Sequence, residues 1–247
     1  MIQRGNAFHV RNSNTSGPAD YTFTYGNPGD VVLVGDWNGD GVDTLTVRRG
    51  AAFHVKNSMS SGVADAVITY GDPGDVVLVG DWDGNGSDTF TVRRGIMFFV
   101  KNSISTGVAD YTFGYGDHGD RVLVGDWDGN RTDTLAVRRG ITYFLRNSTT
   151  SGVADLVFGY GNSDDVAFTG DWNGDGVDSI GVRRPPVAPP PPGPGAPAGP
   201  APASNVNCGH FPTQAAAQAW FLYYYPAYGD IAGLDRDGDM RACETLP

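Results

Sequence analysis

Residues 36–43 read DWNGDGVD, and this eight-residue loop returns as DWDGNGSD at 81–88, DWDGNRTD at 126–133 and DWNGDGVD at 171–178. Each copy begins 45 residues after the one before it. A fixed period of this length is typical of repeat proteins, in which one supersecondary unit is copied and stacked on its neighbours. The loop therefore predicts a repeat architecture for most of the chain.

The residues between two loops have the pattern of short strands. In the first copy, residues 7–11, 21–25 and 44–48 alternate in polarity, and residues 31–34 are continuously apolar, with turn residues in between. This pattern indicates strands and not helices. Four antiparallel strands in about 45 residues is the size of one propeller blade. We expect residues 1–184 to form an all-β, β-propeller-like body of four four-stranded blades.

The repeated loop also has the pattern of a cation site. Each copy carries an acid or amide at its first, third, fifth and eighth positions, with glycine at the fourth. Oxygen ligands at alternate positions of a tight turn suit calcium. The predicted ligands are Asp36, Asn38, Asp40, Asp43, Asp81, Asp83, Asn85, Asp88, Asp126, Asp128, Asn130, Asp133, Asp171, Asn173, Asp175 and Asp178. The alternative is a network of Asx turns, in which these side chains bind backbone amides without metal.

Other repeated residues have a structural and a functional interpretation. The tryptophans beside the loops either pack between blades or stack on a ligand, and the first is favoured. These are Trp37, Trp82, Trp127 and Trp172. Arginine pairs beginning at Arg48, Arg93, Arg138 and Arg183 recur with aspartates such as Asp20, so structural ion pairs or solvated faces are favoured over a basic patch.

The last sixty residues differ from the repeats. Residues 185–204 are rich in proline and predict an extended linker. In residues 205–247, Thr213 is expected to cap a helix that runs to about Tyr224 and ends at Pro226. The only cysteines, Cys208 and Cys243, predict a disulfide and an oxidising compartment.

A second acidic loop ends the chain, with the sequence DRDGDMRACE at residues 235–244. Asp235, Asp237 and Asp239 occupy its first, third and fifth positions. Arg241 is expected to supply a backbone carbonyl, and Glu244, the only glutamate in the chain, to close a calcium cage.

At these residues the chain resembles known families. Residues 205–247, with their two cysteines and the terminal DRDGD…ACE, look like an excalibur domain, which implies an extracellular calcium-binding module of a bacterial surface protein. The family usually has glycine at the position of Met240. The loops of residues 5–184 are similar to the calcium loops of FG-GAP or VCBS propeller repeats. Their last aspartate, for example Asp43, falls one residue earlier than in those families.

The remaining features narrow the function. The formal charge of −11 and the presence of only two lysines argue against nucleic-acid binding, and no run of apolar residues is long enough to span a membrane. Three of the four histidines, such as His9 and His54, stand at aromatic or turn positions, His210 stands alone, and no catalytic motif is found. No signal peptide is visible, and the start MIQRG resembles the later VRRG segments, which suggests a piece of a longer precursor.

We therefore expect a secreted or cell-surface calcium-binding protein without enzymatic activity. Its body would serve as an adhesion or display scaffold, with cell-wall glycan or another surface protein as the partner. The alternatives are a lectin-like propeller and the targeting half of a larger secreted hydrolase. The four blades either close as a monomer or combine in a dimer with an eight-bladed ring.

Overall fold

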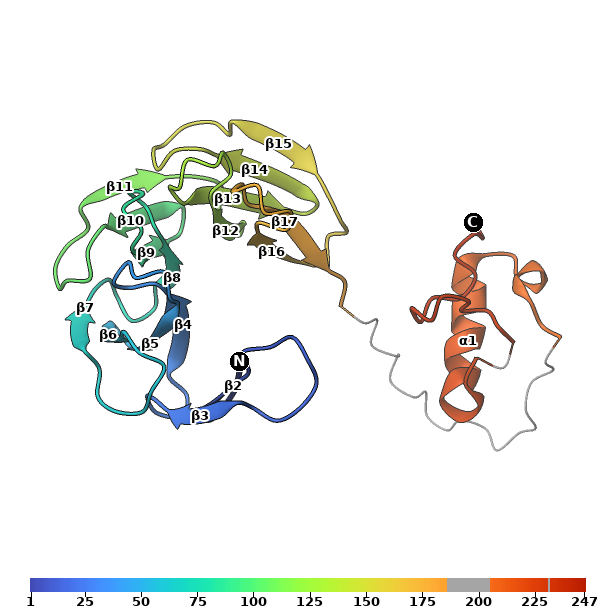
Figure 1. Ribbon diagram of the computed structural model, residues 1–247. Coiled ribbons are helices and arrows are strands. Elements are labelled where there is room, and N and C mark those ends of the chain that lie inside the picture. The colour runs from blue at the N-terminus through green and yellow to red at the C-terminus, as the bar shows by residue number, and fades with distance from the viewer. Residues whose placement is uncertain (186–204, 231) are drawn as a thin grey trace. The chain divides into compact units, whose positions relative to one another are not determined.

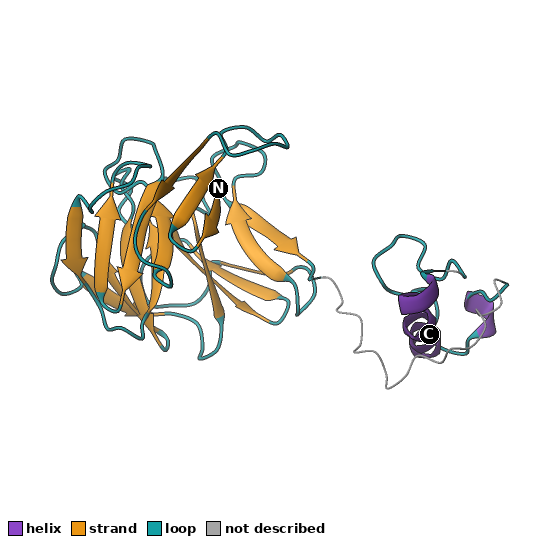
Figure 2. Ribbon diagram, turned by 90° about the horizontal axis from the view of Figure 1, so that it is seen from below, coloured by secondary structure: helices purple, strands orange, loops and turns teal. Residues whose placement is uncertain are grey.

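The computed structural model describes residues 1–185, 205–230 and 232–247, and it divides into two compact units, Met1–Arg183 and Arg184–Pro247. The first unit, which we call the body, contains the strands, and the described helices belong to the second unit (Figure 2). All but one residue of the linker expected at 185–204 lies outside the described residues.

Short antiparallel strands make up the body. In chain order they are β1 Ile2–Arg4, β2 Ala7–Val10, β3 Tyr21–Thr24, β4 Val31–Gly35, β5 Thr44–Arg49, β6 Ala52–Lys56, β7 Ala66–Thr69, β8 Val76–Gly80, β9 Thr89–Arg94, β10 Met97–Lys101, β11 Tyr111–Gly114, β12 Arg121–Gly125, β13 Thr134–Arg139, β14 Thr142–Arg146, β15 Leu156–Gly159, β16 Val166–Gly170 and β17 Ser179–Arg183. The strand positions predicted from the alternating pattern are confirmed.

The strands form five sheets, which we call sheets 1 to 5 along the chain. Sheet 1 is β1-β2-β3, sheets 2, 3 and 4 are β4 to β7, β8 to β11 and β12 to β15, and sheet 5 is β16-β17. The sheets follow one another around an open arc, with β3 and β16 near its two ends (Figure 1).

This arrangement corrects the expected blades. The body is not a closed propeller of four four-stranded blades, because sheet 1 has three strands and sheet 5 has two. Each four-stranded sheet takes its first two strands from one sequence repeat and its last two from the next, as β4 and β5 pair with β6 and β7. The segment between β3 and β4, which reads as a turn, carries the chain from one sheet to the next.

The segment that connects β3 to β4 needs glycine at its start. Gly26 has φ +70°, and a Cβ there would lie 2.9 Å from Val47 and 3.0 Å from Asp30. Side chains seldom adopt this backbone conformation, and here the neighbours leave no room for one. Gly71 and Gly116 repeat the same geometry against Val92 and Val137.

Apolar side chains form the core between consecutive sheets. Phe8 and Phe23 of sheet 1 pack with Leu45 and Val47 of sheet 2. The next interfaces repeat this packing around Phe53 and Phe90, then Phe98 and Leu135, and finally around Tyr143. Strands β5, β9 and β13 are buried along most of their length because neighbouring sheets cover both of their faces, whereas strands such as β2 and β14 bury alternate residues.

The second unit is built on helix α1, Gln214–Tyr228. Thr213 caps it, accepting a hydrogen bond from the Ala216 N–H at 3.2 Å, as predicted. The helix continues past Pro226 and ends before Gly229, which has φ 65°, so the predicted end was too early. The predicted disulfide between Cys208 and Cys243 is present, with a Cα–Cα distance of 5.4 Å. Phe221 and Leu234 lie in the small core beside it.

Among the described residues, no helix is both long and apolar enough to cross a membrane.

Candidate metal centre and the repeat loops

The repeat loops are held by hydrogen bonds to their first aspartate. In each copy one carboxylate oxygen accepts the N–H of the sixth loop residue at 2.6 to 2.9 Å. The other accepts the N–H of the fifth residue at 3.1 or 3.2 Å. These are Asx-type turns, so the first aspartate orders its loop through backbone amides.

The sixth position requires a left-handed backbone. Gly41, Gly86 and Gly176 have φ between 82° and 86°, and Arg131 takes the same conformation with φ 69°. Arginine is strained there because its Cβ crowds the backbone, whereas glycine is not. The third loop therefore carries a backbone strain at its sixth position that the other three copies avoid.

The eighth aspartate is directed at the neighbouring loop. Asp88, Asp133 and Asp178 each accept the backbone N–H of the first aspartate one repeat earlier, at 2.8 to 3.0 Å. The matching backbone bonds run from their own N–H groups to the carbonyls of Asp36, Asp81 and Asp126. The sequence grouped each eighth aspartate with the ligands of its own loop, while the structure uses three of the four to join sheets.

Burial changes the acidity of these joining carboxylates. Loss of hydration raises the pKa of Asp133 to about 6, with smaller contributions from Asp88, Asp178 and Asp81. A carboxyl whose folded pKa exceeds its unfolded pKa stabilises the fold at low pH, and this contribution is lost as the pH rises through the folded pKa. The body should therefore lose stability between about pH 4 and pH 6 because of this group.

Asp133→Asn is expected to remove this dependence. The amide oxygen can still accept the Asp81 N–H, so at neutral pH the variant should be more stable by up to about 3 kcal/mol. Urea denaturation at several pH values measures the difference. Asp43→Asn, at the exposed equivalent position of the first copy, is the matched control. The prediction would be contradicted if the stability of the Asp133→Asn variant depended on pH as that of the wild type does.

The C-terminal loop has the same backbone framework as the repeat loops. Asp235 accepts N–H groups from Gly238 and Asp239 at 3.0 Å and from Met240 at 2.9 Å. Met240 has φ 70° and so occupies the left-handed position that glycine holds in three repeat loops. Sequence reasoning identified Met240 as the residue that replaces a glycine, and its backbone conformation is the one that favours glycine.

Only the C-terminal loop places aspartate at the first, third and fifth positions together. Ligand oxygens of Asp235, Asp237 and Asp239 all lie within 4.8 Å of one another, and they form the one such acidic group found in the described chain. Asp235 is buried and Asp237 and Asp239 are exposed. Three carboxylates at this separation repel one another in water, and a divalent cation would relieve that repulsion.

The two other predicted members of this site are Glu244 and Arg241. Glu244 is exposed and does not belong to the three-carboxylate group. It lines a hollow of about 430 Å³ with Gln214, Gln218 and Leu222 of helix α1. The Arg241 N–H donates to Asp239 at 2.9 Å, which fixes the carboxylate of the fifth position.

Two glutamines of helix α1 hold the acidic loop, and sequence reasoning missed this role. The Gln218 side chain accepts the Ala242 N–H at 2.7 Å and donates to the Met240 carbonyl at 2.9 Å. Gln214 donates to the Ala242 carbonyl at 3.1 Å. Their spacing of four residues on a helix was the available signal, because such residues share one face.

The repeated aromatic residues have two environments. Trp37, Trp82 and Trp127 are buried in the sheet interfaces. Trp172 is 56% exposed, although it covers Gly170 as Trp37 covers Gly35. The tyrosines follow the same division, and Tyr160 is 48% exposed whereas its three equivalents are buried.

The first three arginine pairs form ion pairs, but with other aspartates than the repeated Asp20 type. Arg139 binds both oxygens of Asp120, at 2.9 and 2.8 Å, and this bond is the main cause of the lowered pKa of Asp120. The first arginines of these three pairs, such as Arg138, donate to backbone carbonyls of the next sheet-to-sheet turn. The constant spacing of 19 residues between Asp120 and Arg139 was the signal for this pairing.

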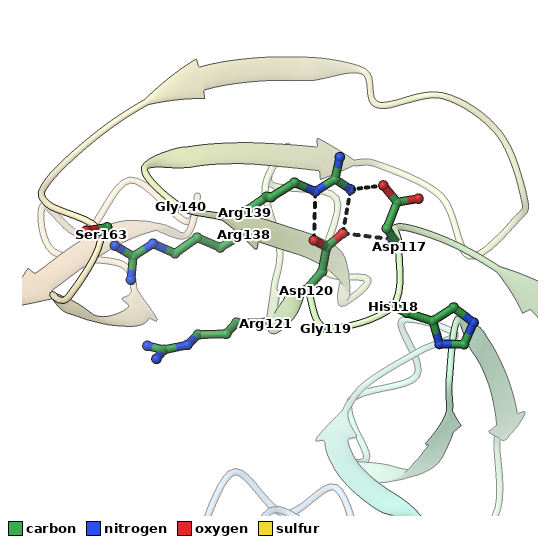
Figure 3. Close-up of a pocket in the computed structure, with 9 residues that line it drawn as sticks. All are labelled: Asp117, His118, Gly119, Asp120, Arg121, Arg138, Arg139, Gly140 and Ser163. Atoms are coloured by element: carbon green, nitrogen blue, oxygen red, sulfur yellow. Dashed lines mark hydrogen bonds and ion pairs between the residues drawn. The ribbon is translucent and has the colours of Figure 1, made fainter.

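A polar pocket of about 460 Å³ surrounds this ion pair (Figure 3). Arg121 and His118 also line it, where the first repeat has Val31 and Pro28. Arg139 is neutralised by Asp120 and Asp117, and it therefore offers little free charge to an anion. The pocket is best explained as the outer side of a structural ion-pair network.

Comparison with known proteins gives no further assignment: no protein-family model matches the chain, and no curated protein is similar to it at a significant level.

Proposed function

We propose that the chain is a secreted or cell-surface calcium-binding protein whose second unit carries the cation. The observation that supports this most is the group of Asp235, Asp237 and Asp239, whose ligand oxygens lie within 4.8 Å of one another. Calcium takes six to eight oxygen ligands, and affinity increases with the number of charged ligands. The backbone carbonyls of the loop and water would complete such a shell.

The surroundings of the loop suit a structural cation. Gln218 and Gln214 tie the loop to helix α1, and the Cys208–Cys243 disulfide closes it. A loop held in this way does not have to be ordered when the ion binds, which favours affinity. The disulfide also suits an oxidising location outside the cytosol.

The repeat loops are proposed as weaker calcium sites. They share the backbone framework of the C-terminal loop, but each has an amide in place of one of its three alternating carboxylates. The smaller charge lowers the expected affinity. The body would then act as a propeller-like scaffold for adhesion or display, with cell-wall glycan or a bacterial surface protein as partner, and without enzymatic activity.

Calorimetric titration of calcium into the full chain tests the proposal. Asp237→Asn should abolish the tightest binding step, and this change leaves the loop's hydrogen-bonding framework on Asp235 and Asp239 intact. Glu244→Gln is the matched control and should retain that step, because Glu244 lies outside the carboxylate group. Wild-type binding no tighter than about millimolar would reject calcium as the physiological ligand.

A second candidate, a carbohydrate-binding body, is favoured by one repeated feature. Equivalent hollows of about 380 and 390 Å³ lie beside Tyr25 and Tyr70, one repeat apart. The second is lined by Phe99 and Arg94, a combination of apolar ring and charge that suits a sugar. Saturable binding on a glycan array, lost in Phe99→Ala, would support this candidate.

A further inference from the structure

The interfaces between consecutive sheets repeat one set of contacts with an inner and an outer part. In the inner part, the N–H of a first loop aspartate donates to the eighth aspartate 52 residues later, as Asp36 does to Asp88. In the outer part, a tyrosine hydroxyl donates to the carbonyl 29 residues later at 2.7 to 3.0 Å. A serine or threonine hydroxyl accepts the N–H 37 residues earlier at 2.9 to 3.0 Å.

The first interface of the arc has only the outer part. Tyr25 donates to the His54 carbonyl and Ser61 accepts the Thr24 N–H, as in later copies. The inner part is missing because sheet 1 has no strands equivalent to β4 and β8. Asp43, the eighth aspartate of its loop, is exposed.

The last interface has only the inner part. The Asp126 N–H donates to Asp178, but Tyr160 is exposed and sheet 5 has no third strand to receive it. Beyond it, sheet 5 exposes Trp172, Phe168 and Val166, an apolar group at one end of the body. Sheet 5 lacks the outer strands that sheet 1 has, and sheet 1 lacks the innermost strand, while its β1 stands in the place of β17.

We propose that these two ends bind each other between two copies of the chain, with β17 of one copy pairing with β2 of the other. The pairing of β5 with β6, in which Val47 lies opposite His54, sets the register. Val182 is the equivalent of Val47 in the last repeat, and His9 is the equivalent of His54 in the first. Val182 of one copy would therefore lie opposite His9 of its partner copy. The combined strands β16, β17, β2 and β3 make a complete four-stranded sheet.

The same register supplies every missing contact. With a period of 45 residues over four repeats, the equivalent bonds run from the Asp171 N–H to Asp43 and from the Tyr160 hydroxyl to the His9 carbonyl. The Gly159 N–H meets the Ser16 hydroxyl, where Gly114 meets Ser151 within the chain at 2.9 Å. All three contacts follow from one register, and the chain has an aspartate at 43 and a serine at 16 where that register needs side-chain acceptors.

The strand that must leave, β1, is weakly held. It has three residues, all exposed, and it occupies on β2 the place that β17 would take. A short exposed edge strand opens at little cost. The incoming β17 has five residues and carries Ile180 and Val182, which are half-buried already.

A second copy fits these ends better than the chain's own other end. The complete interfaces between sheets 2, 3 and 4 fix the arc, in which neither β16 nor β17 pairs with a strand of sheet 1 (Figure 1). Close-packed interfaces do not deform continuously, so self-closure would have to rearrange them. Docking of a second copy leaves them unchanged. A head-to-tail contact of this kind produces rings or filaments.

Cysteine cross-linking in the full chain tests the register. Both native cysteines are paired with each other, and no free cysteine is present in the described chain. A chain with Val182→Cys is mixed with a second chain carrying His9→Cys and mildly oxidised. A two-chain product joined at these positions, located by peptide mass spectrometry, is expected. Ala7→Cys on the second chain, two residues away along β2, is the control and should give at least tenfold less product.

Two further experiments test whether the exposed apolar group of sheet 5 contributes to association and whether the partner is a second copy of the chain. Trp172→Ala should weaken concentration-dependent association in sedimentation at least tenfold, while the chain stays folded by circular dichroism. A cross-link that forms only within one chain carrying both Val182→Cys and His9→Cys would overturn the proposal in favour of self-closure. A wild-type monomer at every concentration would also overturn it. The cation site is not involved, so these outcomes are independent of the calcium titration.

Discussion

Replacing Trp82 with alanine is expected to lower the free energy of unfolding of the body by about 3 to 5 kcal/mol. Trp82 is only 3% exposed and packs with Phe98, Phe113 and Leu135 between sheets 3 and 4. Its removal leaves a large cavity, because both sheets are held apart by their other contacts. Urea denaturation followed by circular dichroism measures the loss.

Trp172 provides the matched control at an equivalent position. It is 56% exposed, and Trp172→Ala should therefore lower stability by less than about 1 kcal/mol in dilute protein. A second variant, Trp82→Phe, keeps an aromatic ring and removes an indole N–H that has no partner among the described residues. It should recover much of the stability. Equal losses for Trp82→Ala and Trp172→Ala would show that the interfaces do not carry the fold.

Loss of the Cys208–Cys243 disulfide is expected to unfold the second unit. The bond joins residues 35 apart in sequence, and closing a loop of this size is worth about 4 kcal/mol in the chain-entropy model. The unit is small, with Phe221 and Leu234 as the large apolar residues of its buried core. Domains of this size have little stability to lose.

The double change of Cys208→Ser and Cys243→Ser tests this in the full chain. Amide hydrogen exchange should lose its protection in helix α1, while the strands of the body keep theirs because they belong to a separate compact unit. Calcium at saturating concentration should restore part of the protection if the ion binds the folded loop. Retained protection without the disulfide or calcium would mean that the apolar core is sufficient.

Strand positions were predictable because they depend on local alternation. The sequence around Phe8 and Val10 alternates with polar residues, and the buried face of β2 follows directly from that period. Leu45 and Val47 alternate with threonine in the same way, but β5 is buried on both faces. Sheet boundaries were not predictable in the same way. The turn after Tyr25 and the loop after Gly35 both contain glycine and aspartate, yet the first changes sheet and the second joins paired strands.

For the acidic loops too, the sequence predicted local contacts but not contacts with distant residues. The three alternating aspartates after Leu234 predicted a carboxylate group, and the structure brings them together because the side chains follow one tight turn. The direction of Asp88 depends on a residue 52 positions away, and spacing within one loop holds no information about it. The helix glutamines that hold the C-terminal loop were missed for the same reason.

The sharing of each four-stranded sheet between two sequence repeats has a consequence for how such a chain can grow. A duplication of 45 residues within the array supplies two strands that complete the sheet before it and two strands that begin the sheet after it, so that the array gains one four-stranded sheet. The new copy is thus joined to both neighbours by strand pairing as well as by packing, and it cannot unfold alone without opening them. Array length can therefore change in evolution while both ends, and the surfaces they carry, stay the same.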